Sequence, residues 1–427
     1  MTEQQENAEP GARNAQPDSS APHAAESPHQ EAINSATEFH PPHVECLDPR
    51  SDLPLDLRVP YFTAELPGIG GTLKAIPEDF EVEEVPAYEP SGAGEHLFLW
   101  IKKRGVAAED LTRHVARSLG ISQGDVGVAG MKDRHAVTRQ FVSVPRAAEA
   151  RVTAINTSDI QVLDARPHGQ KLRTGHLRGN RFRILVRDLP ADAVTRIEPV
   201  KELLLRYGLP NFFGAQRFGR DQETAVLGMQ LLCGGRPPMP GHWSRKRFLR
   251  KLALSAAQSV LFNRYLARRL HDGLLGTVLD GDVMFKVRKG DRSNLPERPE
   301  GCFAQIGPVP FSDIPQTGGM FYVTDRAAEQ ARFDARETVH AGPIFGKKTF
   351  AARAEAAPRE AAILADAGIA ESAFDHFGPL ASGTRRANLV FLDDLAITAL
   401  PHGLEFRFSL PAGSYATVLL GEFMKPS

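Results

Sequence analysis

The sequence predicts an α+β fold, because strand-like and helix-like segments follow one another irregularly along the chain. Residues 80–85 and 181–188 alternate apolar and polar side chains as a half-buried strand does, whereas residues 201–272 have a helix-rich pattern. No regular strand–helix repeat links these segments, which disfavours a doubly wound parallel sheet. The 427 residues are 42% apolar, enough for two or three domains with sizeable cores.

Each element is predicted from a local pattern. One helix is expected to begin at Asp110 as its cap, to bury Leu111, Val115 and Leu119 on one face, and to end at Gly120. Pro145 is expected to end a short strand. The expected strands, in chain order, are residues 80–85, 96–104, 140–144, 181–188 and 405–410.

Residues 1–50 are predicted to be a disordered, acidic tail. They hold nine acidic and two basic residues, several prolines and few large apolar side chains that could offset the entropy of ordering. Residues 66–210 and 373–427 would then form one folded domain, and residues 211–372 a second one inserted into it.

Charge and composition narrow the classes of function. Beyond the tail, 49 basic residues face 43 acidic ones, and residues 201–272 alone hold 13 basic and 4 acidic side chains. Arg245, Lys246 and Arg247 are the densest part of this excess, which favours a nucleic-acid surface over a merely solvated helix. The three cysteines have no zinc spacing, and the sequence shows neither a secretory signal nor a membrane span. We therefore expect a cytoplasmic protein without a metal site.

One segment, residues 128–141, carries chemistry. Asp133 lies between Lys132 and Arg134, and these cations favour an ionised carboxylate, as a nucleophile or an electrostatic stabiliser requires. Gly130 permits a close backbone approach. The alternative is an aspartate that caps a turn. Phosphate-loop and dinucleotide motifs are incomplete, so no nucleotide cofactor is expected.

The same segment resembles the signature of the TruD family of transfer-RNA pseudouridine synthases, Gly-x-Lys-Asp-x-x-Ala-x-Thr-x-Gln. Further segments are similar to family motifs in the expected order, and together they span residues 74–424. They are IPEDFEVEEVP (76–86), LRGNRFRILVR (177–187), GLPNFFGAQRFGR (208–220), FNRYLARRL (262–270), RRANLVFLDDL (385–395) and FSLPAGSYAT (408–417).

The resemblance implies isomerisation of uridine to pseudouridine in tRNA, at uridine 13 in bacterial members, by a monomer that needs no cofactor. It implies a pseudouridine-synthase catalytic domain with a mixed or antiparallel sheet, interrupted by the inserted TRUD domain at about residues 211–372. The expected partner is then tRNA, and neither binding to a membrane nor a nucleotide cofactor is expected.

The resemblance also assigns roles to residues. Asp133 would be the nucleophile, Phe80 and Phe408 would stack on a flipped-out base, and Asn180 would bind the edge of that base. Alternatively, both phenylalanines belong to the core and Asn180 caps a turn. Lys132, Gln140 and Phe182 would have supporting roles, with Phe182 where other pseudouridine synthases place a tyrosine. Arg217 and Arg220 would contact phosphate or hold a domain junction.

Two other functions are alternatives to this one. The protein could bind and refold RNA without catalysis on the same fold. It could also be a carboxylate hydrolase of a glycosidic bond, which would need a second carboxylate with a raised pKa, from Glu78, Asp79 or Glu81.

Overall fold

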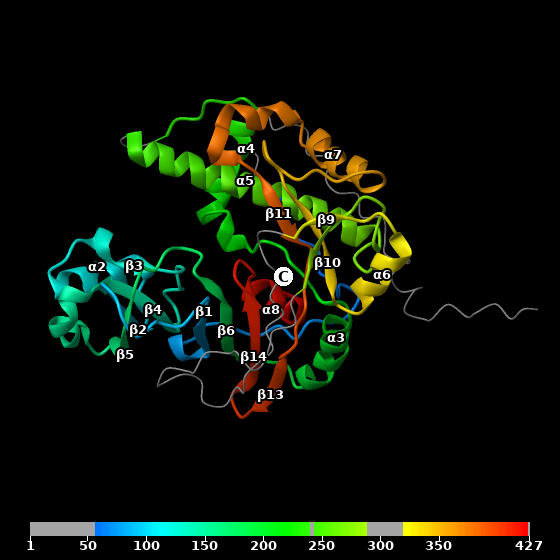
Figure 1. The fold of residues 1–427 in the computed structure, drawn as a ribbon. Helices are drawn as coiled ribbons and strands as arrows, with labels where there is room; N and C mark the ends of the chain where they lie inside the picture. The colour runs from blue at the N-terminus through cyan, green and yellow to red at the C-terminus, as the bar shows by residue number, and fades with distance from the viewer. Residues whose placement is uncertain (1–55, 240–242, 288–318, 426–427) are drawn as a thin grey trace, which may run out of the picture. The chain divides into compact units, whose positions relative to one another are not determined.

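A computed structural model describes residues 56–239, 243–287 and 319–425 of the chain (Figure 1). Within these ranges helices and strands mix irregularly, and the predicted α+β fold class is confirmed. The predicted tail, residues 1–50, lies outside the described residues. No helix in the described ranges combines the length and the apolar character needed to cross a membrane.

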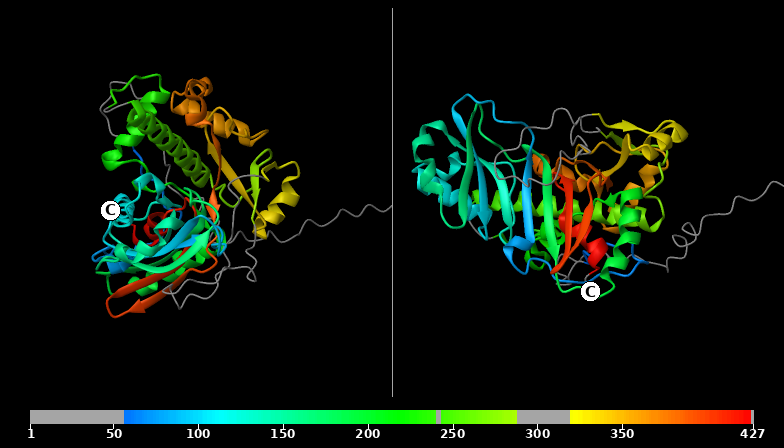
Figure 2. Two further views of the ribbon diagram at one scale, coloured as in Figure 1. Left: turned by 60° about the vertical axis from the view of Figure 1, so that its left-hand side comes forward. Right: turned by 90° about the horizontal axis from the view of Figure 1, so that it is seen from below.

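The largest element is an eight-stranded mixed sheet that continues from β5 at one edge to β13 at the other (Figure 2). Only β1 and β4 pair in parallel, and the other neighbours are antiparallel. β3 (Gly127–Val128) pairs with β4 beside the main order. That order is β13 (Ala396–Leu400), β14 (Gly403–Pro411), β6 (Leu177–Val186), β1 (Phe80–Pro86), β4 (Val137–Pro145), β2 (His96–Arg104) and β5 (Ile160–His168).

Helices cover this sheet in two separate groups. Apolar side chains of β6 and β14 pack with α3 (Ala193–Tyr207) and α8 (Ala416–Met424) in one core. Apolar side chains of β2 and β4 pack with α2 (Ala108–Leu119) and η3 (Arg146–Ile155) in another. Figure 1 shows α2 beside β2 and β5, and α8 beside β14. The centre of the sheet, where β1 lies, is therefore between the two groups of helices.

The second group of elements falls in the chain between β6 and β13. It contains a four-stranded antiparallel sheet in the order β11 (Thr384–Ala387), β10 (Thr338–Ile344), β8 (Val283–Lys286) and β9 (Phe321–Tyr322). β7 (Leu209–Pro210) pairs with β12 (Leu389–Val390). Its helices are α4 (Glu223–Leu232), α5 (Trp243–His271), α6 (Arg326–Asp334) and α7 (Ala356–Asp366). β11 follows residue 372, so this sheet extends past the predicted end of the insertion, whose bounds stay a prediction.

The strands and the helix predicted from local patterns are present, with differences at their ends. Residues 96–104 form β2 with the predicted bounds, and Gly120 ends α2 in the left-handed conformation. The prediction that Asp110 caps α2 is wrong, because the cap is Ala107. Asp110 lies in the first turn, where the helix dipole favours a carboxylate just as it does at the cap. β4 and β6 begin earlier than predicted, since pairing with neighbouring strands extends them.

A buried carboxylate fixes the start of the central strand. Asp79, 2% exposed, ends the short η1 turn (Pro77–Asp79) directly before β1. Its two oxygens accept hydrogen bonds from Nε and Nη2 of Arg187 at 2.9 and 2.6 Å, and Oδ2 also accepts one from the backbone N–H of Ile76. The hydrogen bond from Arg187 holds the pKa of Asp79 below its usual value, against the opposing effect of burial. The pair ties β1 to the end of β6.

We expect Asp79→Asn to lower the free energy of unfolding by about 1.5–3 kcal/mol, measured by urea unfolding at pH 7, because the amide cannot accept the charge-assisted bidentate hydrogen bonds of Arg187. A carboxylate with a lowered folded-state pKa stabilises above its unfolded pKa of about 3.9, and this contribution is lost as the pH falls toward the folded value. The difference between wild type and variant should therefore shrink below about pH 4. Asp110→Asn, which removes an exposed pair with Arg113, should cost less than about 1 kcal/mol. Equal losses in both variants would contradict the anchoring role.

Candidate active site

Asp133 lies in the loop that joins β3 to β4, with its carboxylate half exposed. The cation that pairs with this carboxylate is Lys74, whose Nζ is 3.7 Å from Oδ2. Lys74 is distant in sequence and adopts a positive φ of 58°. The same Nζ lies 4.1 Å from the centre of the Phe80 ring, close enough for a cation–π contact. Lys74 thus links the candidate nucleophile to the start of β1.

Lys132, expected to act directly beside Asp133, pairs elsewhere. Its buried Nζ donates a hydrogen bond to Oε2 of Glu84 in β1 at 2.7 Å. A Cβ atom at Gly130 would come within 3.4 Å of that Nζ, so the glycine leaves room for the lysine. Lys132 therefore holds the loop to the sheet, which agrees with a supporting role.

A third lysine fixes the backbone of Asp133. Lys103, at the end of β2, is fully buried and donates hydrogen bonds of 2.7 Å to the carbonyl oxygens of Asp133 and Val106. Burial lowers the pKa of Lys103 to about 8, although the charge of Asp133 opposes this effect. The side chain is therefore mostly protonated at neutral pH, and it restrains the position from which the carboxylate projects.

The three candidate phenylalanines meet on neighbouring strands. Phe182 lies opposite Phe408 in the pairing of β6 with β14, and their rings stack at 5.2 Å between centroids. Phe80 meets Phe182 edge to face at 6.2 Å. All three are buried and belong to one hydrophobic core, with exposed fractions of 1–6%. The packing matches the core interpretation of Phe80 and Phe408, and their stacking on a base stays a prediction.

Asn180 does not cap a turn, and that alternative is wrong. It lies inside β6, opposite Glu84 of β1 and Leu410 of β14. Its side-chain oxygen is buried and has no hydrogen-bond partner among the residues that the structure describes. The side-chain oxygens of Gln140 and Thr138 in β4 are in the same situation. A buried polar atom without a partner is costly. Of these three residues only Asn180 is partly exposed, whereas Thr138 and Gln140 are fully buried.

The strand registers place these groups on one face of the sheet. Residues directly opposite on paired strands point to the same side, and side chains alternate along a strand. Val82 lies opposite both Phe182 and Thr138, and Lys103 lies opposite Thr138. This face, called here the β1 face, carries Phe80, Thr138, Gln140, Asn180, Phe182, Phe408 and Lys103.

Ion pairs occupy the opposite face and the edge of β1. Glu81 accepts hydrogen bonds from Arg139 and Arg183, at 2.9 and 2.7 Å. Arg104 lowers the pKa of Glu78 through a hydrogen bond, as Arg187 does for Asp79. A glycosidase acid needs a raised pKa. Glu78 and Asp79 are therefore not arranged as a general acid, and Glu81 is held in ion pairs with two arginines.

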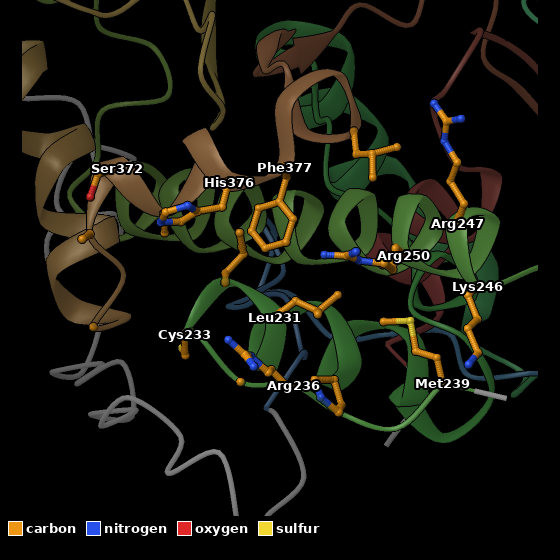
Figure 3. Close-up of a pocket in the computed structure, with 18 residues that line it drawn as sticks. Leu231, Cys233, Arg236, Met239, Lys246, Arg247, Arg250, Ser372, His376 and Phe377 are labelled. Carbon is orange, nitrogen blue, oxygen red and sulfur yellow. The ribbon is translucent and has the colours of Figure 1, made fainter. Parts of the chain in front are cut away.

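The candidate RNA contacts lie in the second group of elements. Arg217 donates hydrogen bonds to Ser255 and to Ser259 of α5, and Arg220 is exposed. Lys246 and Arg247 are exposed near the start of α5, and the side chain of Arg245 lies outside the described residues. Figure 3 shows Lys246 and Arg247 with other basic side chains around a hollow of about 1160 Å³. Residues of the β1 face are not among those that line this hollow.

Sequence reasoning found Asp133 and Asn180 but missed Lys74 and Lys103. Lys74 lies two residues before the segment that resembles the N-terminal family motif, and no local pattern connects it with Asp133. Lys103 lies in a predicted strand between Lys102 and Arg104, and only the alternation of side chains, which places it on the same face as Leu99 and Ile101, was a signal of a buried cation. Both contacts depend on which strands are neighbours.

Comparisons with known proteins identify the family of the chain. The family model described as tRNA pseudouridine synthase D (TruD) matches residues 56–235 and 244–423. The tRNA pseudouridine synthase D of Anaeromyxobacter dehalogenans (strain 2CP-1) is 43% identical over 367 residues, covering 86% of this chain and 96% of the relative. That of Thermus thermophilus is 37% identical, covering 86% and 92%.

A solved structure supports the fold independently. The Methanosarcina mazei protein whose crystal structure carries the name TruD superposes with a TM-score of 0.65 at 23% identity, covering 87% of this chain and 97% of its own. At this identity the likeness shows the fold. With the family match over most of its length, the chain belongs to the TruD family of tRNA pseudouridine synthases.

Proposed function

We propose that this chain isomerises uridine 13 of tRNA to pseudouridine, with Asp133 as the nucleophile. Membership of the family makes the chain an enzyme, an isomerase of the tRNA pseudouridine synthase class. The position of the uridine and the role of Asp133 are the proposed part. The observation that carries it is the exposed carboxylate of Asp133, held by Lys74 and Lys103 beside the β1 face.

The reaction requires the base to leave the RNA stack. The N1–C1′ bond of uridine breaks, the uracil turns, C5 bonds to C1′, and the proton that C5 loses is balanced by one gained at N1. An enzyme that acts on a base offsets the free energy of unstacking with polar contacts to the base edge and with stacking. The amide of Asn180 can both donate to and accept from uracil, and its unpartnered oxygen supports that role.

Asp133 can assist in two ways, and both need an accessible carboxylate. It can attack the base or the sugar, or it can remove a sugar proton to give a glycal. Lys74 attracts and orients the carboxylate from one side, while Lys103 holds its backbone from the other. Both lysines are positioning residues in this proposal, and neither reacts.

The decisive experiment is pseudouridine mapping on unmodified tRNA. Asp133→Asn should abolish conversion while tRNA affinity stays within about threefold, because the side chain is half exposed and carries little of the fold. Wild type should convert one uridine, at position 13. Conversion by the variant at the wild-type rate would refute the assignment. Tight binding without conversion by either protein would favour an RNA-binding protein without catalysis.

Lys74 gives a second test of the site geometry. Lys74→Met should lower kcat by roughly 10- to 100-fold with little change in KM, because the carboxylate loses the group that orients it. Lys74→Arg should restore part of the loss. Lys102→Met removes a lysine whose strand position faces the other side of the sheet, and it should leave kcat near wild type. An unchanged kcat in Lys74→Met, measured under single-turnover conditions, would remove Lys74 from the site.

The basic start of α5 is proposed as part of the tRNA surface. Replacing Arg245, Lys246 and Arg247 by alanine should weaken tRNA binding and flatten its dependence on salt by about 0.9 for each phosphate that the variant no longer neutralises. A control with alanine at Lys201, which is partly exposed, and at Arg326, which is exposed, should keep the wild-type slope, because both cations pair with neighbouring carboxylates. Filter binding across a series of salt concentrations measures the affinity and its salt dependence for the triple variant and for the control. An unchanged slope in the triple variant would place the tRNA elsewhere.

A further inference from the structure

Arg386 is a partly buried cation, and the groups that accept its hydrogen bonds are all neutral. In β11, its guanidinium donates hydrogen bonds to the backbone and side-chain oxygens of Asn211 and to the carbonyl of Gly413. Its Cζ lies 4.0 Å from the centre of the Phe213 ring. Among the described residues no carboxylate pairs with it. Burial lowers the pKa of Arg386 to about 9, and the charge of a neighbouring arginine, Arg217, lowers it as well. The side chain is still charged at neutral pH.

Arg217 is the second cation at this place, and its partners are also neutral. Its guanidinium donates hydrogen bonds to the hydroxyls of Ser255 and Ser259 on α5. Tyr415, the other ionisable group that interacts with both arginines, has a pKa raised by burial and stays neutral near pH 7. Two like charges therefore stand together without a compensating anion in the described part of the chain.

The neighbouring arginine shows how the same fold neutralises a cation when it can. Arg385, one residue earlier in β11, pairs through the two terminal nitrogens of its guanidinium with the carboxylate of Glu360. A charge that is partly removed from water costs free energy unless a partner of opposite charge compensates it. The contrast indicates that the missing negative charge beside Arg217 and Arg386 comes from a ligand.

There is room for that ligand. The two arginines line a cavity of about 420 Å³ together with four hydroxyl side chains, those of Ser255, Ser259, Thr384 and Ser414. Guanidinium forks and hydroxyls are the groups that bind phosphate oxygens in proteins. No aspartate or glutamate is among the residues that line the cavity.

The cavity lies near the ends of two strands that also contribute to the β1 face, β14 and β6. Pro411, at the end of β14, lines it and follows Phe408 by three residues, a rise of roughly 10 Å along the strand. The backbone N–H of Ala412, another lining residue, donates to the carbonyl of Arg178, two positions before Asn180. An RNA strand whose base reaches Asn180 can therefore place a nearby phosphate in the cavity.

We propose that Arg217 and Arg386 form a phosphate-binding site for the RNA backbone close to the uridine that is isomerised. This inference rests on the proposed function for the identity of the polyanion. The chemistry recognised is a phosphodiester, bound by two guanidiniums and neighbouring hydroxyls. The site would fix the strand while the base turns in the active site.

The first test combines a protein change with an RNA change. tRNA is assembled with one neutral methylphosphonate linkage at successive positions around the target uridine, and affinity is measured for wild type and Arg217→Gln. At one or two positions the neutral linkage should weaken wild-type binding roughly fivefold. It should leave the affinity of Arg217→Gln unchanged, because the effects of removing two groups that contact each other do not add. Arg217→Gln should also lower the salt slope by about 0.7–0.9, and Arg217→Lys should restore it. Arg326→Gln, an equal loss of charge, is the control.

The outcomes separate this proposal from the proposed function. Wild-type affinity and slope in Arg217→Gln, or equal methylphosphonate effects in both proteins, would overturn the phosphate site even if wild type forms pseudouridine. If wild type forms no pseudouridine, the affinities of wild type and Arg217→Gln for normal and methylphosphonate tRNA still test the phosphate site. Thermal midpoints exclude a folding defect. Inorganic phosphate at constant ionic strength, without RNA, should raise the midpoint of wild type more than that of Arg217→Gln. Such a shift with unchanged tRNA binding would assign the site to a free anion and overturn the RNA assignment.

Discussion

The parallel pairing of β1 with β4 is the constraint on which the candidate site depends. Parallel strands begin at the same edge of a sheet, so the loop before β4, which carries Asp133, ends beside the start of β1, which carries Phe80. Antiparallel pairing of β1 with β6 then places Asn180 opposite Glu84. Because register fixes which face each side chain occupies, a shift of one residue would send these groups to the opposite side of the sheet. Asp79 and Arg187 secure this register at the start of β1.

Three lysines near Asp133 have different roles because their surroundings differ. Lys74 is partly exposed and contacts both the carboxylate and an aromatic ring. Lys103 is fully buried and bonds to carbonyl oxygens, which satisfies its donors while burial lowers its pKa. Lys132 is buried and forms an ion pair with the carboxylate of Glu84. The positive charge nearest in sequence to the aspartate therefore has a structural role, and the charge that pairs with its carboxylate comes from a distant segment.

Many of the charged side chains around the two sheets pair with a charge of opposite sign. The opposite face of the sheet carries matched arginines and glutamates, and Arg385 has its own carboxylate. Two features of the described residues bear on RNA binding: the unpartnered side-chain oxygen of Asn180 on the β1 face, and the two arginines, Arg217 and Arg386, that line one cavity without an acidic residue. One suits the polar edge of a base and the other suits a phosphate. An RNA strand offers both groups along one chain, which joins the two sites in a single mode of binding.

The sequence by itself determined the α+β class, the strand at 96–104, the end of α2 at Gly120, and the segments that identify the family, since these follow from local periodicity, turn chemistry and motif order. It singled out Asp133 for the same reason. Only the tertiary structure decided that Lys74 pairs with Asp133, that Asn180 lies within a strand with an unpartnered oxygen, and that Arg217 and Arg386 line one cavity. Each of these contacts joins segments far apart in the chain, and strand order and register, which local patterns do not encode, bring them together.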